Sequence, residues 1–135
     1  MITVFDETQR RHAPSQFIVS GKPQPIPGRG RGAGVGFNLN LPLERGAALS
    51  AYARALDAAL ERIGEFAPNV LVVAAGLDIA IDDPFRGFAI TTADFAAIGT
   101  AIAAMGKPMP VVQEGGYPSQ SLGTNLASLL GGLAA

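Results

Sequence analysis

Asn69-Val-Leu-Val-Val-Ala-Ala-Gly76 is a continuous apolar run near the middle of a chain of 135 residues. Such a run is typical of a central parallel strand that is covered on both faces. Parallel strands are joined by crossover connections, usually helices, so the run predicts an α/β sheet. The sequence on either side of the run supports this prediction.

The segment before the run has the pattern of one strand followed by one helix. Apolar and polar residues alternate from Val35 to Leu41, with the two-residue period of a half-buried strand, and Pro42 ends the pattern. Apolar residues then recur at three- and four-residue steps from Leu49 to Ile63. This spacing predicts an amphipathic helix that packs one face on the sheet.

The segment after the run alternates helix, strand and helix. Thr91-Thr-Ala-Asp94 resembles a capping box, with Asp in place of the usual Glu or Gln, and opens a helix. A short strand is predicted at Met109–Gln113, and four leucines between Leu122 and Leu133 mark a final helix. The βαβαβα order predicts an α/β fold with three layers, in which a parallel sheet carries helices on both faces.

The first 34 residues are organised differently. Two short apolar runs, Ile2–Phe5 and Phe17–Val19, precede a stretch rich in Pro and Gly. Pro breaks helices and cannot donate to a sheet ladder, so this stretch is predicted to be an extended connector. We therefore expect three parts: an amino-terminal strand and arm (1–27), a Gly/Arg connector (28–34) and the βαβαβα part (35–135).

Composition disfavours several classes of partner. The formal net charge is −1 and charged residues make up 16% of the chain, so no strong field attracts nucleic acid or an anionic membrane. The Gly-rich stretch 28–34 lacks the Lys-Ser/Thr of a phosphate loop. No apolar run is long enough to span a bilayer, and the first residues lack a signal-peptide pattern, so a cytoplasmic protein is expected.

The low count of soft metal ligands limits the chemistry further. The chain has no Cys and one His, His12. Alone it cannot build a thiolate site or a zinc site with two or three His ligands. His12 has no partner close in sequence and is interpreted as structural or solvated.

Two loops at the predicted carboxyl edge of the sheet carry the candidate functional residues, because ligands bind at this edge of parallel α/β sheets. The first loop contains three carboxylates, Asp78, Asp82 and Asp83. Carboxylate oxygens bind zinc and harder cations. Asp is also common in solvated turns, and Asp-Pro starts turns, so both interpretations stay open.

The second loop, Glu114-Gly-Gly-Tyr-Pro118, places one aromatic side chain after two glycines. The Tyr117 hydroxyl is suited to donating a hydrogen bond to an oxyanion that develops on a carbonyl. A surface aromatic on a turn is the simpler interpretation. Glu114 is either a loop acid or an acceptor of backbone amides.

Several segments resemble, in order and spacing, the C-terminal half of the zinc-dependent deacetylases. The resemblance is closest to the bacterial acetylpolyamine amidohydrolases, relatives of the histone deacetylases. The segments are Asn38-Leu-Asn-Leu-Pro-Leu43, Val72-Val-Ala-Ala-Gly-Leu-Asp78, Asp82-Asp-Pro84 and Val112-Gln-Glu-Gly-Gly-Tyr117. Residues 3–22 are similar, less specifically, to that family's amino-terminal strand and loop.

The resemblance implies part of an arginase–deacetylase-like fold and a set of site residues. In the family, the Asp of the Asp-Pro pair is a zinc ligand, and it corresponds to Asp83. The Tyr that follows Gly-Gly polarises the acetyl carbonyl and corresponds to Tyr117. Gly115 and Gly116 match the loop that shapes the substrate pocket.

The sequence departs from the family where the other metal ligands are expected. The family's Asp-x-His ligand pair and its tandem His-His lie between the amino-terminal strand and the Asn-Leu-Pro segment, and neither motif occurs in this sequence. A catalytic zinc needs three protein ligands and a water, and only Asp83 remains of the expected three. Zinc is therefore expected to be absent or weakly bound.

Three hypotheses about function follow. The first is a shortened deacetylase-like protein that is inactive alone and forms homo-oligomers, because strands without their neighbours have open edges. The second is an active zinc-dependent amide hydrolase whose site is completed by a partner chain, with an acetylated amine or acetyl-lysine as substrate. The third is a non-enzymatic binding module.

Overall fold

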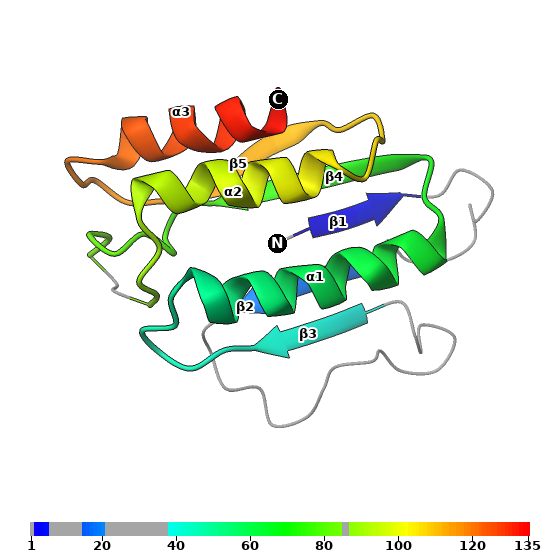
Figure 1. Ribbon diagram of the computed structural model, residues 1–135, viewed down its shortest axis with the longest axis horizontal. Helices are drawn as coiled ribbons and strands as arrows, with labels where there is room; N and C mark the ends of the chain where they lie inside the picture. Colours follow the sequence, from blue (N-terminus) through cyan, green and yellow to red (C-terminus); the bar gives the residue numbers. More distant parts are fainter. Residues whose placement is uncertain (1, 6–14, 21–37, 85–86) are drawn as a thin grey trace.

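The computed structural model describes residues 2–5, 15–20, 38–84 and 87–135. Within these ranges one sheet carries three helices (Figure 1). The strands are β1 (Ile2–Phe5), β2 (Ser15–Ser20), β3 (Asn38–Pro42), β4 (Val70–Gly76) and β5 (Val111–Gly115), and the helices are α1 (Leu49–Phe66), α2 (Thr92–Ala103) and α3 (Leu122–Leu133). No helix in this part of the chain is long and apolar enough to cross a membrane.

The sheet has the strand order β3-β2-β1-β4-β5. β4 pairs with β5 and β2 pairs with β3, both in parallel, whereas β1 runs antiparallel to β2 and to β4. The predicted α/β class with parallel strand pairs is confirmed, and the described sheet differs from the prediction in that β1 is antiparallel to both of its neighbours. An apolar run shows that a strand is covered but not which way its neighbour runs, since both ladder types satisfy the same backbone groups.

One apolar core joins the sheet to all three helices. β4 contributes alternate residues, which a strand directs to one face. The members of the core from β4 and the helices are Leu71, Val73, Ala75, Tyr52, Leu56, Ile63, Phe95, Ile98, Ile102 and Leu129. Figure 1 shows α1 and α2 in front of the strands. All three helices contribute to the core that Leu71, Val73 and Ala75 of β4 join, so the described helices cover this face rather than the two faces that the sequence predicted.

The ends of the helices follow the local signals in the sequence. The Asp94 carboxylate accepts the backbone N–H of Thr91 at 2.8 Å, as the predicted capping box requires. α1 ends where Ala67 adopts a left-handed conformation with a φ of 52°, just before Pro68. The predicted connector, residues 28–34, and His12 lie outside the described residues.

α2 and α3 pack against each other more extensively than any other pair of described elements. Glycines permit this contact. A Cβ atom at Gly99 of α2 would collide with the carbonyl oxygen of Leu129, and one at Gly132 of α3 would collide with the carbonyl oxygen of Ala96. The two helices therefore touch through their backbones, which brings their amino-terminal ends together beside the carboxyl edge of the sheet.

Candidate functional site

The two loops with candidate functional residues meet where β4 and β5 end. Gly76 lies opposite Gly115 in the parallel ladder, after a shift in register. The Leu77 N–H donates to the Gly115 carbonyl at 3.2 Å. Further out, the Tyr117 N–H donates to Asp83 Oδ2 at 3.1 Å. The topology therefore brings the loops together as the sequence predicted.

Asp83 is buried in this contact, with 2% of its surface exposed. A turn places it there, because its own N–H donates to the Ala80 carbonyl at 3.1 Å. A buried carboxylate is costly unless hydrogen bonds or charges compensate it. The Tyr117 N–H provides part of that compensation and fixes the start of the second loop to the first.

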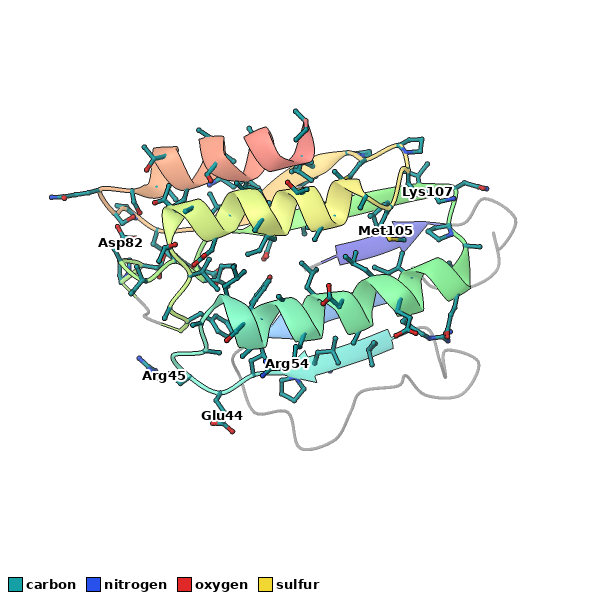
Figure 2. The ribbon with its side chains drawn as sticks, in the orientation of Figure 1. Glu44, Arg45, Arg54, Asp82, Met105 and Lys107 are labelled. Carbon is teal, nitrogen blue, oxygen red and sulfur yellow. The ribbon has the colours of Figure 1, made fainter. Side chains whose placement is uncertain are left out.

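Asp82, the adjacent carboxylate, is exposed and binds the start of α3. Its Oδ1 accepts the Ser121 hydroxyl at 2.7 Å, and its Oδ2 accepts the Ser121 N–H at 3.3 Å. The hydroxyl of Ser121 is the main cause that holds the pKa of Asp82 below its usual value. Figure 2 shows Asp82 beside the loop that leads into α3.

The Asp78 side chain lies beside the backbone at the ends of β4 and β5. A Cβ atom at Gly76 would lie 2.8 Å from Asp78 Oδ1, and one at Gly115 would lie 2.7 Å from the same oxygen. Glycine at both positions therefore leaves room for this carboxylate. Gly116 has a φ of +111°, which favours glycine, and a Cβ there would lie 2.8 Å from Leu77 Cβ.

The two loops lie within a segment that is similar to known proteins. Residues 15–133 match the family described as Histone deacetylase domain. The chain belongs to the histone deacetylase family. It is 41% identical over 93 residues to the acetylpolyamine amidohydrolase of Mycoplana ramosa, and 42% identical over 94 residues to that of Burkholderia pseudomallei. These matches cover 69% and 70% of this chain but 27% and 28% of the relatives, so the chain spans little more than a quarter of their length.

Solved structures of histone deacetylase relatives have the same fold over most of this chain. The crystal structure of acetylpolyamine aminohydrolase from Burkholderia pseudomallei superposes with a TM-score of 0.83 and 37% identity, covering 88% of this chain and 37% of that one. The crystal structure of the HDA15 HD domain gives a TM-score of 0.70 at 26% identity, over 76% of this chain and 30% of that one. The predicted resemblance and the partial deacetylase-like fold are confirmed.

The donor set of the described residues does not fit the zinc on which the histone deacetylase family depends. Asp83 accepts the Tyr117 N–H and Asp82 accepts Ser121, whereas Asp78 Oδ1 lies where Cβ atoms on Gly76 and Gly115 would stand, so the three carboxylates are directed to different places. Among the described residues there is no group of three or more His, Cys, Asp or Glu side chains suited to a metal ion. Catalytic zinc takes three protein ligands.

The remaining predicted residues lie at the surface of the same edge. Tyr117 is 45% exposed, and Glu114 is exposed at the end of β5. Asn125, which no sequence pattern singled out, is 1% exposed and bonds to Ser121 and Thr92. A signal was present: Asn125 falls within the leucine spacing of the last helix, where a polar side chain on a buried face needs hydrogen-bond partners.

Tyr52 is a buried residue of α1 within the apolar spacing from Leu49 to Ile63, and the sequence did not single it out. Its ring meets that of Phe88 edge-to-face, with centroids 6.1 Å apart at 85°. Burial raises the pKa of the Tyr52 hydroxyl to about 12, and the negative charge of Asp78 adds to the shift. This core tyrosine therefore links α1 electrostatically to the Asp78 loop.

The raised pKa of Tyr52 predicts a pH dependence of stability. The contribution of neutral, buried Tyr52 to the free energy of unfolding is fully present below pH 10.0, the ordinary pKa of tyrosine. It is lost as the pH rises to about 12, because Tyr52 ionises in the unfolded chain before it ionises in the folded one. The expected loss in the free energy of unfolding is about 2–3 kcal/mol. Urea unfolding at increasing alkaline pH measures it. Tyr52→Phe should remove this part of the slope and Tyr117→Phe should keep it; equal slopes in wild type and Tyr52→Phe would contradict the assignment.

Proposed function

We propose that this chain carries the carboxyl-terminal part of a deacetylase-type active site and is inactive when alone. The hydrogen bond from the Tyr117 N–H to Asp83 supports this proposal. It holds together the family's position for a zinc-binding carboxylate and its position for the tyrosine that polarises the substrate carbonyl. The other ligands of the family are histidine-containing motifs, and the sequence has one His.

The proposed substrate class of the complete site is an acetylated amine, since the relatives are named acetylpolyamine amidohydrolases. Tyr117 would donate its hydroxyl proton in a hydrogen bond to the acetyl oxygen as that oxygen gains negative charge. Its exposed position on the second loop leaves the ring accessible to such a substrate. Gly115 and Gly116 would line the substrate pocket with their backbone, while Asp78 and Leu77 fill the space where their side chains would stand.

The test is an assay of the purified 135-residue chain with added zinc, using acetylated polyamines and a fluorogenic acetyl-lysine peptide. We expect no chelator-sensitive turnover and less than one zinc per chain, because one carboxylate does not compensate for the lost hydration of a divalent ion. Tyr117→Phe and Asp83→Asn should match the wild type. A chelator-sensitive rate that Tyr117→Phe abolishes would instead support the active hydrolase completed by a partner chain.

We also propose that the chain self-associates through β5. β5 is the last strand of the sheet, so one side of its backbone is unpaired in the described residues. Val111 and Val112 are 36% and 54% exposed, and successive strand residues point to opposite faces. A net charge of −1 gives little repulsion between two copies, which favours a second copy as the partner.

A further inference from the structure

Four polar side chains connect the first loop to α2 and α3 through a chain of hydrogen bonds. The Thr92 hydroxyl donates to Asn125 Oδ1 at 2.6 Å. Asn125 Nδ2 donates to Ser121 Oγ at 2.8 Å, and the Ser121 hydroxyl donates to Asp82 Oδ1 at 2.7 Å. These residues join segments that are more than thirty positions apart in the sequence. We refer to them as the Thr92–Asp82 chain.

The Asp82 carboxylate sets which groups donate along the Thr92–Asp82 chain. A carboxylate only accepts hydrogen bonds, so the single hydroxyl proton of Ser121 is committed to Asp82. Ser121 Oγ can then only accept from Asn125, which requires the NH2 group of the amide on that side and its oxygen toward Thr92. Asn125 is the one member that donates on one side and accepts on the other through different atoms, and it is 1% exposed.

The two adjacent carboxylates hold both ends of the segment 117–121. Asp83 accepts the N–H of Tyr117, and Asp82 accepts the N–H and hydroxyl of Ser121. Although Ser121 occupies the N-cap position of α3, its side chain makes no capping bond to that helix. The hydroxyl is used instead to bind the first loop.

We propose that Asn125 is a positioning residue of the candidate site. Asn125 orients the Ser121 hydroxyl toward Asp82. This orientation holds the segment 117–121, which includes Tyr117, against the loop that carries Asp82 and Asp83. The inference rests on the proposed function only in giving Tyr117 a role toward substrate. The seating of the segment is measurable without any activity, so an unexpected deacetylase rate would leave this test unaffected.

The test compares Asn125→Asp and Ser121→Ala with two matched variants. Asn125→Asp keeps the shape but replaces the donor by an acceptor, so two carboxylates compete for the one Ser121 proton. Ser121→Ala removes the hydroxyl, and Ser121→Thr restores it. Thr124→Ala is the control, because the Thr124 hydroxyl donates to the Ser121 carbonyl at 2.8 Å and takes no part in the Thr92–Asp82 chain.

Amide hydrogen exchange at Tyr117 and Ser121, measured by NMR, gives the main result. We expect exchange to be roughly tenfold faster in Asn125→Asp and Ser121→Ala, since about one net hydrogen bond is lost. The amides of Leu71 and Val73 in β4 should keep their protection. Ser121→Thr should exchange like the wild type because it restores the hydroxyl. Thr124→Ala should also match the wild type, which would not be the case if any weakening of the helix were enough to accelerate exchange.

A second measurement follows Tyr117 directly. The chain has two tyrosines and no Trp, so in a Tyr52→Phe background the intrinsic fluorescence reports Tyr117 alone. Its anisotropy should fall in Ser121→Ala and recover in Ser121→Thr. If Asn125→Asp fails to fold, the comparison of Ser121→Ala with Ser121→Thr still tests the proposal. Unchanged exchange at Tyr117 and Ser121 in Ser121→Ala, or equal acceleration in Thr124→Ala, would overturn the proposal.

Discussion

Gly132→Ala is expected to destabilise the fold by about 3 kcal/mol, the upper end of the usual cost of overpacking. The added methyl group would collide with the carbonyl oxygen of Ala96, and its carbon would also lie 2.9 Å from the carbonyl carbon of that residue. Backbone atoms in the middle of α2 cannot rotate away as a side chain can. Relief of the collision therefore requires the two helices to separate.

Gly131→Ala is the matched control for this substitution, in the same turn of α3. A Cβ atom there meets nothing within 4 Å. Ala in a helix interior is favoured over Gly by about 0.5–1 kcal/mol, so this variant should be slightly more stable than the wild type. Urea unfolding at fixed protein concentration measures both free energies. Equal effects of the two substitutions would contradict close backbone contact between α2 and α3.

The contact between α2 and α3 also determines the geometry of the candidate site. Thr92 is the first residue of α2, Asn125 lies in the first turn of α3, and their side chains are 2.6 Å apart. A wider separation of the helices would break this bond. Gly132→Ala should therefore accelerate amide exchange at Tyr117 as well as lower stability, which connects the packing of the helices to the seating of the loop.

Much of the fold was predictable because it depends on local patterns. The apolar run at β4 gave a buried strand, and the Thr91–Asp94 capping box gave the start of α2. The direction of β1 was not predictable in this way. Its pairing with β4 is a contact between residues far apart in the sequence, and a short strand fits either ladder.

The candidate site was likewise predictable only in part from the sequence. Topology placed Asp83 and Tyr117 at one edge of the sheet, but it did not predict which carboxylate binds which partner. That choice depends on the turn between Leu77 and Asp83, whose backbone bonds turn successive side chains in different directions. Three carboxylates within six residues left a cation site and a solvated turn as open interpretations. In the structure Asp83 accepts the Tyr117 N–H, Asp82 accepts Ser121, and Asp78 Oδ1 lies where Cβ atoms on Gly76 and Gly115 would stand.

On the proposal that the chain self-associates through β5, Val112→Lys is expected to raise the dissociation constant at least roughly tenfold and to give a monomer at micromolar concentration. Val112 is 54% exposed on β5, the edge strand of the sheet. A lysine there must keep its ammonium group in water, so it opposes the docking of a second strand. Light scattering and sedimentation velocity over a range of concentrations measure the change.

Ile81→Lys is the matched control for the edge of the sheet. Ile81 is 55% exposed, nearly the same as Val112, but it lies in the first loop rather than on β5. If exposed apolar area alone drove association, both lysines would weaken it equally. If strand pairing at β5 drives association, only Val112→Lys weakens it, because a second strand pairs with the unpaired backbone groups of an edge strand. A wild-type chain that is monomeric at tens of micromolar would refute association through this edge.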